Sequence, residues 1–422
     1  MSFKITITLV IIFFVYFINS NTSIGFGDAL GFVWASECCF QLGTNATSHF
    51  LYVNFLRLLV IMFSYFDAFQ IASFVSILFS LITLLLVYCT SFKISDSSWA
   101  SVISVIILAF SFTYWRQTEI VEVYTFNLAF LTLLFFLSTI VLIDESKRQI
   151  IFLISILMGI SLWIHIQNIL IFPAFIYLCY VVDKQWINVL VKLIPASLIG
   201  LLLFVLPFIT NQNSVMSVLV ENTFFLSKAI DHDVYYYFNS LLKNVGFLLY
   251  NLHLFLFFSI WGLIKLFKKY PRVGFFYFLV GLPYFVFPIF YDVPDNYVFA
   301  LVFYLVLAIT SVFGIDDFIK KQFIQKLKIV VVLVAFTLSP ALYFSVYKLS
   351  ENISHLDKIK ESKAYKGGFK YLLWPGMRNN VSLIEYSKYL NNSNEFRSNF
   401  EEFKWNYDLA MAYIKWKNKE NL

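Results

Sequence analysis

The chain has 422 residues, of which 60% are hydrophobic, 20% are aromatic and only 13% are charged. Soluble globular domains carry about 25% charged residues, so the composition excludes an ordinary soluble protein and indicates an all-α membrane protein with many spans. The formal net charge of +6 gives no reason to expect a nucleic-acid partner, because Lys and Arg in a membrane protein largely reflect its orientation.

Apolar runs long enough to cross a hydrocarbon core of about 30 Å recur along the chain. They predict about eleven transmembrane helices. The expected spans lie near residues 5–20, 69–92, 99–114, 124–143, 150–165, 168–183, 188–211, 245–266, 274–291, 297–315 and 329–348. We interpret the first as a retained span rather than a cleaved signal peptide, because no A-x-A site follows it.

Charged residues in the loops predict the orientation, since Lys and Arg concentrate on the cytoplasmic side. If the N-terminus is cytoplasmic, one side carries Lys4, Lys93, Lys147, Arg148, Lys184, Lys265, Lys268, Lys269, Arg272, Lys320, Lys321, Lys326 and Lys328. The opposite side then carries Asp28, Glu37, Glu119, Glu122, His165, Glu221, Asp231, Asp233, Asp292 and Asp295. The acidic side is expected to be periplasmic or lumenal, and the Phe-, Ile- and Lys-rich composition favours a bacterial inner membrane.

Two exterior segments are predicted. Residues 21–66 form a long first loop, in which residues 51–66 are expected to lie in the membrane plane as an interfacial helix, with Asn54 and Arg57 on one face. Residues 1–348 would then form the transmembrane domain, and residues 349–422 an exterior tail or small helical domain with a helix near 400–418.

Acidic side chains follow the predicted spans directly on the exterior side. Asp28 comes after the first span, and Glu119 and Glu122 lie in a short loop after Arg116. Arg116, Glu119 and Glu122 follow one another at intervals of three residues, so on a helix end they share a face. Asp28 either caps the next helix or works as a catalytic carboxylate. Likewise, Arg116 and the two glutamates form either a solvated helix end or a substrate site.

Three stretches resemble a known membrane family. Ser111–Gln117, followed by Glu122–Asn127, resembles the S-x-x-x-W-x-Q … E-V-Y-x-x-N signature of the family called domain of unknown function 2723. Gly25–Asp28 resembles its Gly-Asp motif, and Gly159–His165 resembles its Gly-Leu-x-x-x-x-His segment. The chain resembles a divergent member, because Ala29-Leu30-Gly31 replaces the family's Ser-Gly-Glu.

The resemblance implies a GT-C fold similar to that of protein O-mannosyltransferases, and a donor sugar carried on a polyprenyl phosphate. The expected catalytic residues are Asp28, as the base for the acceptor hydroxyl, and Glu122, which binds hydroxyls or assists Asp28. The reaction would invert the anomeric configuration, and the acceptor would be a protein, a glycan or a lipid.

The remaining expected site residues would bind substrate. Phosphate contacts are expected from Arg116, His165, Arg57 and His49, and further contacts from Glu119, Trp115 and Tyr124. Each basic residue also has a structural interpretation: a buried histidine can bond a backbone carbonyl, and Arg57 can reach lipid headgroups.

No zinc motif, Walker A motif or dinucleotide motif is present. Asp292 and Asp295 leave room for a divalent cation, although a turn around Pro294 explains their spacing better. The main alternative function is a transporter or flippase for a lipid-linked or small solute, which should place ionisable residues near the bilayer midplane. A polysaccharide polymerase or ligase should instead show a large late exterior loop, whereas the largest predicted loop here is the first.

Overall fold

The computed structural model describes residues 3–41, 49–209, 232–291, 293, 295–321, 324, 326–393 and 400–420. Regular structure within these ranges consists of α-helices and short 3-10 helices, without a strand. This confirms the predicted all-α class. Glu221, Asp231 and Asp292, which the sequence assigned to exterior loops, lie outside the described residues.

Within the described ranges, seven segments are long and apolar enough to cross a membrane, or up to nine if each of two bent helix pairs counts as one span. The seven are α4 (Ala68–Ser95), α7 (Tyr124–Ile143), η1 (Glu145–Ile150) with α8 (Ile151–Ile164), η2 (Ile166–Ile171) with α9 (Phe172–Asp183), α14 (Pro271–Phe290), η3 (Asn296–Ala300) with α15 (Leu301–Ile319), and α17 (Lys328–Ser350). The bent pairs are α5 (Ser98–Ala109) with α6 (Phe112–Thr118), and α12 (Val234–Leu252) with α13 (Phe255–Lys269).

The prediction of about eleven spans exceeds this number partly because the first predicted run forms a shorter helix. Helix α1 (Phe3–Asn19) has 17 residues, and at 1.5 Å per residue it reaches only about 25 Å. Helix α10 (Trp186–Ile209) has 24 residues, which at 1.5 Å per residue is long enough for the span predicted near 188–211.

Both bends lie inside runs that the sequence predicts as straight spans. The α5–α6 axis turns by 72° and the α12–α13 axis by 97°. A break within a membrane frees backbone groups that need new partners. Here the Asn251 side chain accepts a hydrogen bond from the Thr113 amide at 2.8 Å, and the Tyr343 hydroxyl donates to the Phe110 and Asn251 carbonyls. Backbone groups at the two breaks therefore find hydrogen-bond partners in the Asn251 side chain and in Tyr343 of α17.

Helix α15 lies at the centre of the bundle and packs against α4, α5, α13 and α14. Its spanning segment is 89% buried, compared with 17% for that of α17 at the periphery. Its approach to α13 depends on Gly262, where a Cβ atom would lie 1.9 Å from the Thr310 carbonyl oxygen. Small residues allow such close packing where lipid offers no hydrophobic drive between helices.

The loops that carry the Lys and Arg clusters meet at one end of the bundle. Their contacts join loops that are separate in the sequence: Lys4 over the Trp99 ring at 4.3 Å, Lys269 Nζ to the Ile94 carbonyl at 3.4 Å, and Arg272 to Glu145.

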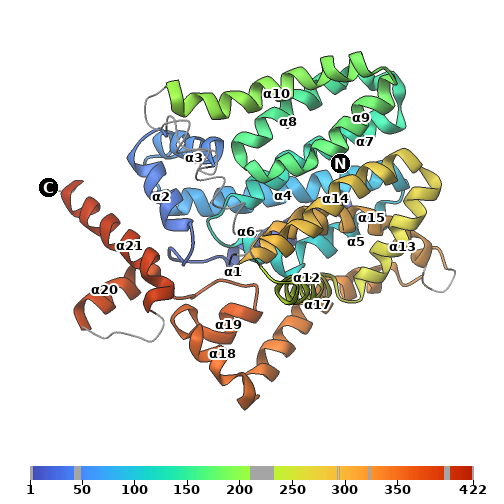
Figure 1. Ribbon diagram of the computed structural model, residues 1–422. Helices are drawn as coiled ribbons and strands as arrows, with labels where there is room; N and C mark the ends of the chain where they lie inside the picture. Colours follow the sequence, from blue (N-terminus) through green and yellow to red (C-terminus); the bar gives the residue numbers. More distant parts are fainter. Residues whose placement is uncertain are drawn as a thin grey trace.

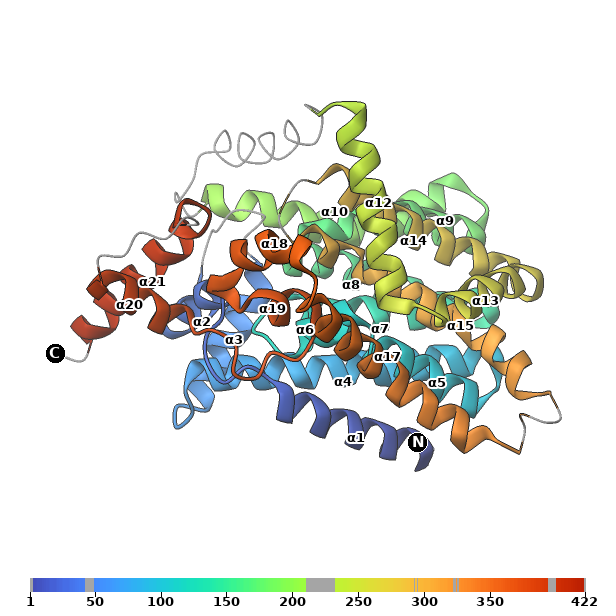
Figure 2. The ribbon, with the colours of Figure 1, turned by 90° about the horizontal axis from the view of Figure 1, so that it is seen from below.

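The first loop and the tail lie together, away from that end (Figures 1 and 2). The loop holds α2 (Ala29–Cys38) and α3 (Phe50–Met62); α3 has 13 residues, too few for a span. The tail holds η4 (Ser354–Leu356), α18 (Asp357–Ser362), η5 (Ala364–Lys366), α19 (Gly368–Leu373), α20 (Leu383–Ser393) and α21 (Phe400–Glu420). The helix predicted near 400–418 is thus confirmed, whereas the interfacial position of α3 and the domain division at residue 348 stay predictions.

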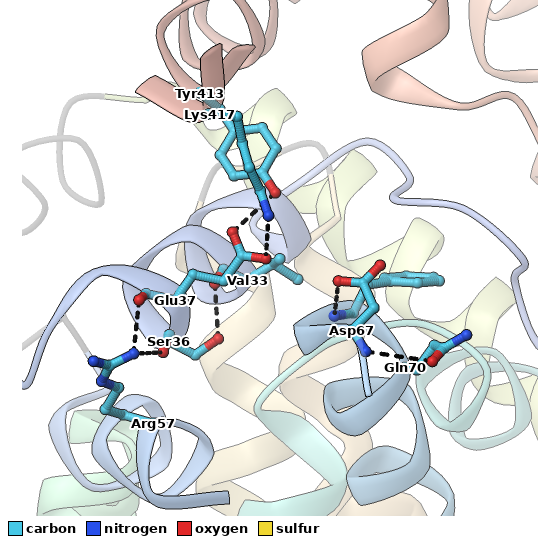
Figure 3. Close-up of polar contacts among 9 residues, drawn as sticks. Val33, Ser36, Glu37, Arg57, Asp67, Gln70, Tyr413 and Lys417 are labelled. Carbon is cyan, nitrogen blue, oxygen red and sulfur yellow. Dashed lines mark hydrogen bonds and ion pairs between the residues drawn. The ribbon is translucent and has the colours of Figure 1, made fainter. Parts of the chain in front are cut away.

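Polar contacts attach α21 to α2 (Figure 3). The Glu37 carboxylate accepts hydrogen bonds from Lys417 Nζ at 2.9 Å and from the Tyr413 hydroxyl at 3.0 Å. On the other side of α2, Arg57 of α3 donates to the Ser36 and Glu37 carbonyls at 3.1 and 2.6 Å. The tail is therefore held against the first loop, next to the segment that carries Asp28.

Candidate active site

A cavity of ≈ 290 Å³ lies where the first loop, the end of α6, the start of η3 and the tail meet. Its volume is close to the lower limit of about 300 Å³ for small-ligand sites. The lining residues come from four parts of the chain: Asn21 and Gly25 to Ala29 with Phe69; Arg116, Gln117 and Ile120 to Glu122; Asp295 and Tyr297; and Tyr365, Lys366, Tyr371, Met377, Asn380, Trp405 and Asn406.

Three carboxyl groups gather in this cavity, contributed by Asp28, Glu122 and Asp295. The Asp28 side chain keeps a solvent-accessible surface, but the surrounding protein atoms partly desolvate it and raise its pKa, and the Asp295 charge raises the pKa further. The pKa of Glu122 is raised well above its usual range by burial and then by Asp28 and Asp295. Asp295 is also solvent-accessible; partial desolvation by the surrounding atoms raises its pKa, while Lys366 acts in the opposite direction. The three groups therefore act on one another as like charges.

The backbone around Asp28 fixes the position of its side chain. Gly27 has φ +105°, a left-handed conformation that favours glycine, and its amide donates to Asn406 Oδ1 of α21 at 3.1 Å. The Asp28 amide donates to the Glu122 carboxylate. Asp28 occupies the N-cap position of α2 but makes no side-chain capping hydrogen bond. The capping interpretation is therefore wrong, and the Asp28 side chain is exposed on the cavity.

Arg116 lies on the cavity wall and is only 4% exposed. Its guanidinium donates to the Tyr371 carbonyl and, at 3.4 Å, to the Tyr297 hydroxyl, and it lies 4.5 Å from the centre of the Tyr371 ring. The Arg116 Nε atom is buried without a hydrogen-bond partner. A buried cation with an unused donor is suited to bind an anion.

Glu119 and Trp115 lie behind the cavity rather than on its wall. The Glu119 carboxyl accepts a hydrogen bond from the Trp115 indole and one from the Met377 amide at 2.9 Å. Burial raises the pKa of Glu119 well above its usual range. The Trp115 ring also contacts Trp374, with 5.7 Å between centroids. Both residues attach the tail to α6.

His49, His165 and Tyr124 form a separate group that does not line the cavity. The two histidine rings lie 4.8 Å apart, and Tyr124 is 5.8 Å from His165. Burial lowers the pKa of both histidines, that of His165 well below its usual range. Their Nδ1 atoms bond the Ile164 carbonyl and the Gln167 amide. Neutral histidines with backbone partners are poor phosphate ligands, and Arg57 is likewise engaged by the end of α2.

Several cavity residues were missed by sequence reasoning. Gln117 lies within the recognised signature, and its Oε1 atom is buried without a partner. Lys366, Tyr371 and Asn380 come from the tail, where neither composition nor a motif indicates a phosphate or sugar site. Only the folded structure identifies them, because they reach the cavity with Arg116 only where the tail packs against the first loop.

Among the residues that the structure describes, no three His, Cys, Asp or Glu side chains are arranged to hold a metal ion. Asp28, Glu122 and Asp295 are close enough to influence one another but do not form such a group. The divalent cation that the sequence left open at Asp292 and Asp295 stays a prediction, because Asp292 lies outside the described residues.

Comparisons with known proteins bear on this site. Residues 38–189 match the family model described as the N-terminal domain of protein O-mannosyl-transferase TMEM260. The match supports a glycosyltransferase and does not identify domain of unknown function 2723 in particular. It includes Arg116 and Glu122 but not Asp28, Asp295 or the tail. No curated protein sequence matches the chain.

The fold is similar to that of the oligosaccharyltransferase AglB from Archaeoglobus fulgidus. The complex of that enzyme with an inhibitory peptide and a dolichol-phosphate has a TM-score of 0.54 at 10% identity, covering 89% of this chain and 60% of that one. The apo form of an oligosaccharyltransferase from the same organism has a TM-score of 0.55 at 11% identity, covering 88% and 60%. The complex of an oligosaccharyltransferase from this organism with Zn and sulfate has a TM-score of 0.51 at 12% sequence identity, covering 87% of this chain and 57% of that one. This chain thus spans about three fifths of those proteins, and at such identities the likeness shows the fold.

Together, the matched domain and the fold support a membrane glycosyltransferase.

Proposed function

We propose that the chain transfers a sugar from a polyprenyl-phosphate donor to an acceptor hydroxyl, with inversion at the anomeric carbon. The observation that carries this proposal is the pairing of an exposed carboxyl, Asp28, with a buried cation, Arg116, on the wall of one cavity. A displacement reaction needs both, a base for the attacking group and a partner for the leaving group.

Asp28 is the proposed base. Its side chain is exposed and makes no capping bond, and its raised pKa makes the ionised carboxylate a stronger proton acceptor than an ordinary aspartate. Asp28 takes the proton of the acceptor hydroxyl as the oxygen attacks the anomeric carbon. The bond from that carbon to the phosphate oxygen breaks, and the phosphate leaves with the electron pair.

Glu122 is the proposed support for this base. Its carboxylate accepts the Asp28 amide hydrogen and the Val123 amide hydrogen, which fixes the turn from which the Asp28 side chain reaches the cavity. Glu122 is half-buried, whereas Asp28 and Asp295 are exposed. This arrangement favours assistance to Asp28 over direct hydroxyl binding, the two roles that the sequence left open.

Arg116 is the proposed phosphate ligand, because the leaving phosphate gains negative charge as the bond breaks. Phosphate binding by His165, His49 and Arg57 has less support, since all three have backbone partners outside the cavity. The same applies to substrate binding by Glu119, Trp115 and Tyr124, which do not line the cavity.

The proposed partners follow from the compared proteins. The AglB structure holds a dolichol-phosphate and an inhibitory peptide, and the matched family model is that of a protein O-mannosyl-transferase. We therefore infer a polyprenyl-phosphate donor and favour a protein acceptor over a glycan or a lipid. The meeting of the Lys and Arg loops at one end supports a cytoplasmic N-terminus and a periplasmic or lumenal site. A bacterial inner membrane is proposed from the Phe-, Ile- and Lys-rich composition.

A transporter or flippase is less well supported. It would need a path lined by ionisable groups at mid-membrane depth, whereas the cavity described here is lined mainly by the loops that follow the spans and by the tail, with Arg116 and Gln117 at the end of α6 and Phe69 at the start of α4.

The test is transfer by purified protein in nanodiscs from polyprenyl-phosphate mannose, glucose and arabinose to a panel of Ser- and Thr-containing peptides. The proposal predicts a glycopeptide of inverted anomeric configuration with at least one donor. If no sugar is transferred to any acceptor and the protein instead moves the donor lipid between the two leaflets, the transport alternative would be favoured.

A further inference from the structure

Two cations share one aromatic ring in the cavity. The Arg116 guanidinium carbon lies 4.5 Å from the centre of the Tyr371 ring, and Lys366 Nζ lies 5.4 Å from the same centre. All three residues line the cavity. Arg116 comes from α6, whereas Lys366 and Tyr371 come from η5 and α19 of the tail. The tail therefore brings a second positive charge to the proposed phosphate ligand.

The groups around this ring are mainly hydrogen-bond donors. Arginine and lysine side chains have no acceptor atom, and Arg116 Nε is buried without a partner. The amide nitrogen of Asn380, which also lines the cavity, is buried without a partner too. Unused donors next to two cations call for a ligand that is anionic and accepts several hydrogen bonds.

The charge of Arg116 is not balanced by the protein groups that bind it. Its guanidinium donates hydrogen bonds to a carbonyl and to a hydroxyl, both neutral. Glu119 and Arg116 interact electrostatically, but the hydrogen bonds that the Glu119 oxygens accept come from the Trp115 indole and the Met377 amide and not from Arg116. A buried guanidinium without an ionised partner is costly unless a ligand supplies the charge.

We propose that Arg116, Lys366 and Asn380, arranged around Tyr371, form an anion site for the phosphate of a polyprenyl phosphate. The inference rests on the proposed function and adds to it that the tail supplies part of the donor site. Lys366 is assigned as a phosphate ligand, Asn380 as a neutral donor to the same group, and Tyr371 as the residue that positions both cations.

The place of the tail favours a lipid phosphate over a soluble one. The Arg378 guanidinium, two residues before Asn380, donates to the Ile18 carbonyl at 2.8 Å. Ile18 lies in the last turn of α1, and the tail itself begins where α17 ends. The anion site is therefore next to the ends of two apolar helices, within reach of a headgroup whose chain stays in the membrane.

The experiment compares wild type with Lys366→Met, Lys366→Arg and a control, Lys370→Met. Lys370 bonds the Arg378 carbonyl and does not line the cavity. Binding of polyprenyl phosphate, polyprenol and inorganic phosphate is measured in nanodiscs by native mass spectrometry, without a sugar. We expect the wild type to bind polyprenyl phosphate more tightly than polyprenol or inorganic phosphate. Lys366→Met should weaken that binding about tenfold, Lys366→Arg should retain most of it, and Lys370→Met should leave it unchanged.

Equal affinity of wild type and Lys366→Met for polyprenyl phosphate would overturn the assignment, provided thermal unfolding shows both variants folded. Equal binding of polyprenol and polyprenyl phosphate by wild type would also overturn it. Inorganic phosphate that binds as tightly as the lipid would show a soluble anion as the occupant and reject the lipid. Because no sugar transfer is needed, a phosphate site that depends on Lys366 would stand even if transfer failed. Transfer that Lys366→Met left unchanged would refute the site while the proposed function held.

Discussion

The backbone amide of Asp28 donates a hydrogen bond to the side-chain carboxylate of Glu122. This contact joins the first exterior loop to the loop after α6, two segments separated by several helices in the sequence. It also places two carboxyl groups in one cavity with Asp295. The electrostatic coupling among these three groups, and the attachment of the tail beside them, lead to the following predictions.

Asp295→Asn should move the acidic limb of the pH–rate profile to lower pH. Asp28 must be ionised to act as a base, so the rate rises with pH through its pKa. The Asp295 charge raises that pKa, and removing the charge lowers it. The measurement is kcat/KM for transfer as a function of pH, with Asp96→Asn as control, since Asp96 ends α4 outside the cavity. A limb that stays in place or moves to higher pH would refute the coupling.

Gly27→Ala should reduce both transfer and stability. Gly27 has φ +105°, and an L-residue in a left-handed conformation costs about 1–2 kcal/mol. Relief of that strain would move Asp28, which follows directly. The matched control is Gly31→Ala in α2, where a Cβ atom meets nothing within 4 Å. Transfer rate and thermal unfolding are compared for both variants; equal behaviour would mean that the Gly27 turn does not position the base.

Glu119→Gln should loosen the tail from α6. The Glu119 carboxyl accepts hydrogen bonds from Trp115 and Met377, and an amide at this position leaves one buried donor unmatched, at a cost of about 1–3 kcal/mol. Limited proteolysis should cleave the tail faster than in wild type, and the KM for the donor should rise. Glu385→Gln, at an exposed position of α20, is the control. Unchanged cleavage would show that the tail is held by other contacts.

Gly262→Ala should destabilise the bundle, because its Cβ atom would lie 1.9 Å from the Thr310 carbonyl oxygen. Forcing α13 away from α15 should cost about 1–3 kcal/mol or more. Gly246→Ala in α12 meets nothing within 4 Å and should be neutral or slightly stabilising. Thermal unfolding in detergent measures both. A Gly262→Ala protein as stable as Gly246→Ala would show that the two helices separate without cost.

The sequence predicts much of the membrane part because hydrophobic length and charge are properties of local segments. Asp28, Arg116 and Glu122 could be found in this way, since each follows a predicted span on the same side. The bends at Phe110 and His253 could not be found, because composition stays apolar across both breaks. They depend on Asn251 and Tyr343, which supply partners from distant helices.

The tail residues could not be predicted for a different reason. Lys366 and Asn380 reach the cavity only because α19 lies against α17 and α21 against α2, and neither contact has a sequence motif. Conversely, Arg57 was assigned to phosphate from its charge and place alone. Its hydrogen bonds to the carbonyls at the end of α2 are a tertiary feature that no local pattern records.

The central claim, that Asp28 is the base for glycosyl transfer, is tested most directly by the single-turnover transfer rate of Asp28→Asn. The substitution keeps the backbone amide that bonds Glu122, so it removes the carboxylate while the turn is retained. We expect transfer to fall by about 10²-fold or more, with donor binding unchanged and Asp96→Asn equal to wild type. A rate for Asp28→Asn within a factor of a few of wild type would contradict the account.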